Sequence, residues 1–130
     1  MHAIIVIQDL QSANLLVCAS ALIALCKLVT KDMIPALMPH VVVLLKHKNP
    51  VIRKKAVMGV MRFWQLDSDS IASHRSVIGR QICDPDPSVM GSGICLTYEM
   101  IKVTLSNLSM LVRACVRAYA RACVGRVRVL

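Results

Sequence analysis

The polar residues that could do chemistry are few, and they do not form a catalytic set. The chain has one glutamate, Glu99, and its aspartates cluster near the starts of predicted helices, where capping explains them. His74 has no evident acidic or nucleophilic partner that would make it a base. Residues 91–93 (GSG) are too short for a phosphate-binding loop, and neither a nucleophile elbow nor a Walker pattern occurs. We therefore expect no enzymatic activity and no cofactor.

The six cysteines raise the question of disulfides or a bound metal. They contain no C-x-x-C pair, and each lies in an apolar run predicted to be helical, where a free thiol packs as a small hydrophobic group. The four histidines are scattered without the spacing of metal ligands. We expect reduced thiols in the core and no metal site. The cysteines are Cys18, Cys26, Cys83, Cys95, Cys115 and Cys123.

Three consecutive basic residues, Arg53, Lys54 and Lys55, form the most suggestive polar feature. They could contact an acidic phospholipid headgroup or the acidic surface of a partner protein. The structural alternative is that these cations line a solvated edge or pair with neighbouring elements. We favour the structural alternative and keep the contact site as a hypothesis.

Positive charge is concentrated at the end of the chain. The formal net charge is +9, but five arginines without any acidic neighbour lie in the last 18 residues, and the rest of the chain carries only about +4. Three of the five are four residues apart and share one face of a predicted helix, which gives an alternative function: a basic helical module that binds acidic membrane or nucleic acid. We favour an atypical tail and no nucleic-acid partner. The five are Arg113, Arg117, Arg121, Arg126 and Arg128.

The elements around these residues repeat. Asn49-Pro50 is a strong helix start, because the Asn side chain can accept a free backbone N–H and Pro at the first helical position gives up a donor that the helix does not use. Asp86-Pro87 repeats this start 37 residues later, and Ser12 stands 37 residues earlier as a further capping residue. Three capped helix starts at one period indicate a helical-repeat array.

Composition supports the same fold class. The chain is 56% hydrophobic and 3% aromatic, a composition that suits helix-on-helix packing better than a β-sandwich. Asn/Asp-Pro-x-Val before a basic helix is similar to the signal of HEAT repeats. We predict an all-α fold, a right-handed α-solenoid of about three HEAT- or armadillo-like helix pairs. The predicted helices, after the end of a first helix at residues 3–10, span about 14–29, 33–46 (capped by Asp32 and kinked at Pro39), 49–66, 70–83 (with its cap in 67–69) and 88–103.

No segment has the pattern of a membrane span. The longest uncharged stretch, between Asp9 and Lys27, is interrupted by polar residues, whereas a spanning helix needs about 20 predominantly apolar ones. The first residues lack the basic region and cleavage site of a signal peptide. We expect a protein without a transmembrane segment.

Four motifs in order along the chain resemble a known family. They are residues 9–15 (DLQSANL), 33–39 (MIPALMP), 51–57 (VIRKKAV) and 83–91 (CDPDPSVMG). These motifs resemble the trunk of the large adaptin subunits, in particular the epsilon class of adaptor protein complex 4 of plant type. The resemblance covers about residues 8–103, and the residues from about 104 onward do not match the motifs. It divides the chain into an adaptin-like trunk fragment, 1–104, and an atypical Arg-rich tail, 105–130.

The resemblance implies a function and partners. Large adaptins are HEAT-type solenoids in heterotetrameric vesicle coats, which also contain a second large, a medium and a small subunit. Such coats sort cargo and form vesicles at trans-Golgi and endosomal membranes, with which they associate peripherally from the cytoplasm. The trunk supplies shape and subunit contacts rather than catalysis. Because complete large adaptins have a much longer trunk, a hinge and an appendage, the chain is expected to be a fragment or truncated product.

Overall fold

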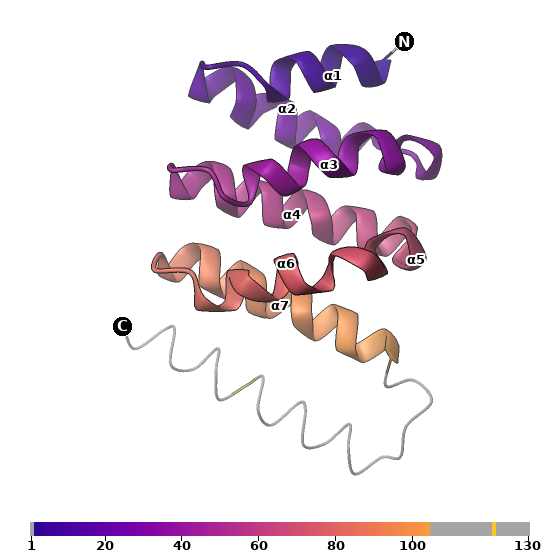
Figure 1. Cartoon of the computed structure of the whole chain (residues 1–130), viewed down its shortest axis with the longest axis vertical. Helices are drawn as coiled ribbons and strands as arrows, with labels where there is room; N and C mark the ends of the chain where they lie inside the picture. The colour runs from indigo at the N-terminus through magenta and orange to yellow at the C-terminus, as the bar shows by residue number, and fades with distance from the viewer. Residues whose placement is uncertain (1, 105–120, 122–130) are drawn as a thin grey trace.

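The structure, a computed structural model, describes residues 2–104 and Arg121, and within residues 2–104 all regular secondary structure is helical (Figure 1). The helices follow one another as antiparallel pairs stacked along the long axis of the molecule. The predicted α-solenoid is confirmed for these residues. The helices are α1 (His2–Leu10), α2 (Leu15–Leu28), α3 (Ile34–Leu44), α4 (Pro50–Leu66), α5 (Ser68–Ile71), α6 (Arg75–Gly79) and α7 (Pro87–Thr104).

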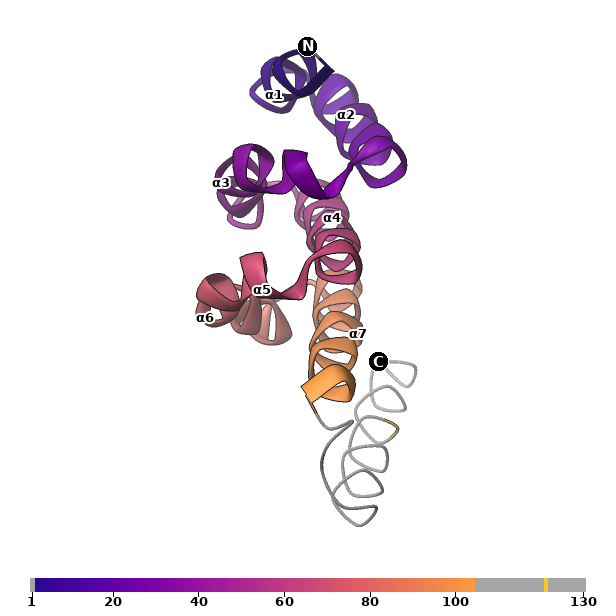
Figure 2. The ribbon, with the colours of Figure 1, turned by 90° about the vertical axis from the view of Figure 1, so that its right-hand side faces the viewer.

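The stack has two layers. One layer contains α2, α4 and α7, and the other contains α1, α3 and the short helices α5 and α6 (Figure 2). Helix α4 is the middle of its layer, because it contacts α2 on one side and α7 on the other. The first two pairs pack on each other through both layers, α1 on α3 and α2 on α4, while the second and third pairs meet mainly through α4 and α7.

Side-chain caps fix the starts of α4 and α7. The Asn49 side chain accepts the N–H of Val51 at 2.9 Å, and Pro50 takes the first helical position. The Asp86 carboxylate accepts the N–H groups of Ser88 at 2.9 Å and Val89 at 3.2 Å. Both helices begin where the Asn-Pro and Asp-Pro pairs predict.

Two predicted caps are wrong. The first is Ser12, since α2 is capped by Asn14, whose side chain accepts the N–H of Leu16 at 3.0 Å. Ser12 instead accepts the backbone N–H of Asn14 and shapes the turn before the helix. The second is Asp32, which lies inside a 3-10 turn (Lys31–Met33), so that α3 begins after it at Ile34 without a side-chain cap.

The predicted helix at 70–83 is not continuous. The segment contains α5, a 3-10 turn (Ala72–His74), α6 and a second 3-10 turn (Arg80–Cys83). Residues 68–83 contain several serines and a glycine, which are weak helix formers. They are Ser68, Ser70, Ser73, Ser76 and Gly79. Ile71 and Ile78 are nevertheless fully buried, so the broken segment still fills its place in the layer that contains α1 and α3 (Figure 2).

The core lies between the two layers. Phe63 of α4 is fully buried among aliphatic side chains from neighbouring helices, and Leu22, Leu37 and Val41 are fully buried as well. Gly59 of α4 is also buried, and a Cβ there would meet a methyl carbon of Leu25 at 3.6 Å, an ordinary van der Waals distance. Pro39 lies inside α3, as predicted.

Gly93 has a clear packing role. A Cβ at this position would lie 2.9 Å from the backbone carbonyl carbon and oxygen of Gln81, closer than real Cβ contacts come. The backbone of the 3-10 turn at Arg80–Cys83 crosses α7 at this glycine. Its low helix propensity is therefore the cost of a close approach between two elements of one repeat.

Candidate functional site

Arg53 binds the turn that precedes α7. Its Nε donates to Asp84 Oδ2 and its Nη2 donates to Asp84 Oδ1, both at 2.8 Å. Its Nη1 donates to the backbone carbonyls of His47 at 2.9 Å and Lys48 at 3.0 Å. Only 14% of the Arg53 side chain and 8% of the Asp84 side chain are exposed.

This ion pair is coupled to the caps on both sides. Asp84 Oδ1 also accepts the N–H of Asp86, the residue that caps α7. The hydrogen bond from Arg53 is the main reason that the pKa of Asp84 is lowered, and the same bond raises the pKa of Arg53. One guanidinium therefore joins the 47–49 turn to the 84–86 turn and locks two successive repeats together.

The basic triplet therefore separates into two parts. Arg53 follows the structural alternative, because all three of its guanidinium nitrogens donate to groups inside the molecule. Lys54 is exposed and Lys55 is half-buried, and neither forms an ion pair or hydrogen bond with the described residues. Sequence reasoning missed Asp84, because its partner lies 31 residues away and no local rule links the two.

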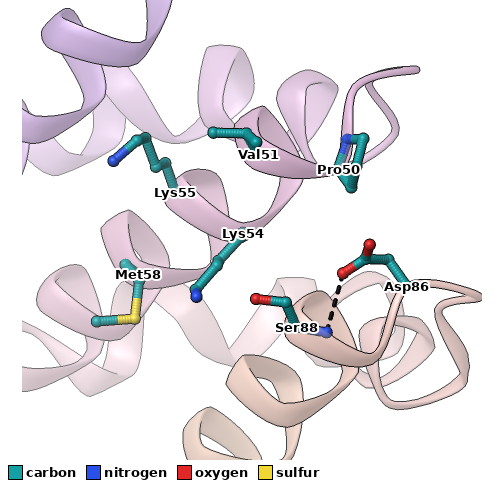
Figure 3. Close-up of a pocket in the computed structure, with 7 residues that line it drawn as sticks. All are labelled: Pro50, Val51, Lys54, Lys55, Met58, Asp86 and Ser88. Atoms are coloured by element: carbon teal, nitrogen blue, oxygen red, sulfur yellow. Dashed lines mark hydrogen bonds between the residues drawn. The ribbon is translucent and has the colours of Figure 1, made fainter.

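Lys54 and Lys55 line a pocket between α4 and the start of α7. The pocket has a volume of about 350 Å³, and Figure 3 shows the lysines on the α4 side and the cap of α7 opposite them. Two exposed apolar side chains of α4 belong to its wall, Val51 (54% exposed) and Met58 (44% exposed). We call this site the α4–α7 groove. Its lining residues are Pro50, Val51, Lys54, Lys55, Met58, Asp86 and Ser88.

The groove lies in a positively charged region of the layer formed by α2, α4 and α7. Neither α2 nor α4 contains an acidic residue, whereas α4 alone contributes Arg53, Lys54, Lys55 and Arg62. Burial raises the pKa of the Cys26 thiol on α2, and the positive charges of Lys55 and Arg62 act against that rise. The positive field of α4 therefore reaches the neighbouring helix.

The other candidate residues form no site in the described part of the chain. His74 hydrogen-bonds to Ser73, and Glu99 pairs with Lys102 on the surface of α7. Groups of three or more His, Cys, Asp or Glu able to hold a metal do not occur in residues 2–104, and no helix there is long and apolar enough to cross a membrane.

The prediction of core thiols holds for only part of the described cysteines. Cys18 is buried, and its thiol donates to the Leu10 carbonyl at 3.6 Å, while Cys26 is half-buried. Cys83 and Cys95 are exposed, which corrects the prediction: Cys83 ends a 3-10 turn and Cys95 lies on the outer face of α7. All four thiols are free. Cys115, Cys123 and the arginine-rich tail other than Arg121 lie outside the described residues.

Comparison with known protein families shows to which family the chain belongs. Residues 4–124 match the family described as the adaptin N terminal region. The chain belongs to this family. The match extends beyond residue 103, where the four quoted motifs end, and includes most of the tail of this adaptin chain.

Curated relatives of this adaptin chain include three epsilon subunits. It is 38% identical over 105 residues to the AP-4 complex subunit epsilon of Arabidopsis thaliana, covering 81% of this chain and 11% of the relative. It is 42% identical over 98 residues to the Dictyostelium discoideum subunit, covering 73% and 9%. It is 28% identical over 124 residues to the mouse subunit epsilon-1, covering 95% and 11%. The chain thus spans about a tenth of the length of these relatives.

Proposed function

We propose that this chain is a non-catalytic scaffold segment of a large subunit in an adaptor-protein vesicle coat. Its work is intracellular protein transport: the segment holds other coat components in place while cargo is sorted and vesicles form. The observation that carries the proposal is the match of residues 4–124 to the adaptin N terminal region. The names of the relatives, epsilon subunits of AP-4 complexes, favour the same complex for this chain.

The fold is suited to such a role. Stacked helix pairs offer long surfaces of exposed side chains and no deep catalytic cleft, and repeat proteins use such surfaces for binding. The inter-repeat ion pair Arg53–Asp84 gives this stack a fixed geometry. A scaffold needs that rigidity, because its partners must be held at defined positions.

The partners that we propose are the other subunits of the coat: a second large subunit, a medium subunit and a small subunit. The proposed location is the cytoplasmic side of trans-Golgi and endosomal membranes and of coated vesicles. Membrane association is peripheral and runs through the assembled complex. Of the basic triplet, Lys54 and Lys55 remain available to an acidic partner, while Arg53 does not.

Co-expression tests the proposal. The full 130-residue chain is expressed with the second large, medium and small subunits of the Arabidopsis AP-4 complex, and the mixture is separated by size exclusion. We expect the chain to elute with at least one of these subunits. Elution of a folded, helical chain by itself, with the subunits in separate fractions, would contradict the proposal.

A further inference from the structure

The α4–α7 groove combines features that are unusual on a solvated helix surface. Exposed apolar side chains of α4, Val51 and Met58, stand in its wall beside Lys54 and Lys55. Neither lysine forms an ion pair with an acidic side chain of the described residues, although Asp86 lines the same groove. Asp84, in the turn before α7, is bound by Arg53.

The opposite wall of the groove has a different character. Asp86 and Ser88 stand there, at the start of α7 (Figure 3). Asp86 Oδ1 accepts two backbone N–H groups of α7, and its Oδ2 has no hydrogen-bond donor among the described residues. The groove therefore presents two cations, one carboxylate oxygen and an apolar wall within a volume of about 350 Å³.

The mixture of charges identifies the kind of partner that fits. Carboxylates on a partner can pair with Lys54 and Lys55, and an aliphatic side chain can occupy the space beside Val51 and Met58. A backbone or side-chain N–H of the same partner can bind Asp86 Oδ2. A lipid headgroup offers no aliphatic side chain to the wall of Val51 and Met58, whereas a folded protein surface can present carboxylates, an N–H group and an aliphatic side chain together. The chemistry thus favours a protein surface over a membrane surface.

We propose that the α4–α7 groove is the docking site for another subunit of the coat, which contacts it with an acidic surface carrying an inserted aliphatic side chain. This inference rests on the proposed scaffold function and names the surface that performs it. The absence of acidic residues from α2 and α4 extends the complementary field along the layer. The partner approaches the α2–α4–α7 layer, while the α1–α3–α6 layer remains free of it.

Two substitutions in the groove test the proposal, each with a matched control in the other layer. Lys54→Glu with Lys55→Glu reverses the groove charge, and Lys46→Glu with Arg80→Glu makes the same change at two exposed residues beyond α3 and α6. Val51→Asp places a carboxylate in the apolar wall, and its control is Val43→Asp on α3, where the original side chain is 69% exposed. Circular dichroism verifies that each variant is folded.

The measurement is retention of the AP-4 subunits named above on the immobilised full chain. We expect each groove variant to retain about tenfold less subunit than the wild type, and each control to match the wild type. Equal retention by groove and control variants would overturn the docking site while leaving the scaffold function intact. No retention by the wild type would overturn both.

A membrane arm separates the two sources of acidic charge. The same variants are sedimented with vesicles of equimolar phosphatidylcholine and phosphatidylserine. If the groove charge reversal abolishes vesicle binding but leaves subunit retention unchanged, the groove is a lipid contact and the proposal is wrong. Loss of subunit retention with unaltered vesicle sedimentation is the result that supports it.

Discussion

The guanidinium of Arg53 and the carboxylate of Asp84 form a two-pronged ion pair between neighbouring repeats, with Nε–Oδ2 and Nη2–Oδ1 distances of 2.8 Å. The third guanidinium nitrogen, Nη1, donates to the His47 and Lys48 carbonyls in the turn that opens α4. The pair is largely shielded from solvent and is hydrogen-bonded on both sides. It fixes the stacking of the second and third helix pairs. The two lysines that follow Arg53 form no such pair with the described residues.

Removal of Arg53 is expected to destabilise the fold. Arg53→Ala leaves Asp84 partly buried without its cation, which lowers the free energy of unfolding by about 3 kcal/mol. Lys54→Ala is the control, because this exposed lysine forms no pair, and its effect stays within about 0.5 kcal/mol. Urea titration followed by circular dichroism measures both variants. Equal unfolding free energies for Arg53→Ala and Lys54→Ala would contradict the structural role of the pair.

Acid is expected to weaken the same interaction. Because the pKa of Asp84 is lowered in the folded state, its contribution to stability is present above the unfolded pKa of about 3.9 and is lost as pH falls through the lower folded value. The unfolding free energy should therefore fall below about pH 4 in the wild type. The fall is shallower in Asp84→Asn, which lacks this carboxylate, while Asp67, whose pKa is also lowered, still contributes. Identical acid dependence in the two proteins would show that the pair contributes nothing.

Two glycines should respond in opposite ways to the same substitution. Gly93→Ala places a methyl group against the Gln81 backbone and lowers the unfolding free energy by about 2 kcal/mol. Gly79→Ala meets nothing within 4 Å and raises it by about 0.5 kcal/mol, because alanine is the better helix former. Thermal and urea unfolding give both values. A Gly93→Ala protein as stable as the wild type would mean that α7 and the 3-10 turn are not in close contact.

The cysteines should differ in reactivity in the native protein. Iodoacetamide reaches the exposed thiols of Cys83 and Cys95 first, while the buried thiol of Cys18 is labelled only after unfolding. Peptide mass mapping after short labelling times assigns each site. Early labelling of Cys18 would indicate that α2 does not pack on α1 as described.

The sequence was informative where a local rule determines the structure. Asn49-Pro50 and Asp86-Pro87 predict helix starts because the cap and the proline act on residues within one turn. The assumption of a strict 37-residue period misplaced the first cap at Ser12, since the actual capping residue, Asn14, is two positions later. Asp32 failed as a cap because the chain forms a 3-10 turn there before α3 begins.

The candidate site was only partly predictable. The run of Arg53, Lys54 and Lys55 is visible in the sequence, but their different roles depend on Asp84, which only the stacking of repeats brings near. The exposure of Val51 and Met58 likewise depends on which face of α4 lies between its neighbours. The broken helix at 68–83 reflects competition between weak helix formers and two buried isoleucines, which a helical pattern alone cannot resolve.

Hydrogen exchange of the full chain, alone and with the AP-4 subunits, tests the central claim most directly, because it locates a scaffold contact without altering any residue. The account predicts that the subunits slow exchange in peptides covering the first turns of α4 and α7, at residues 50–58 and 86–92, and leave α1 and α3 unchanged. Unchanged exchange throughout, or protection confined to α1 and α3, would contradict it.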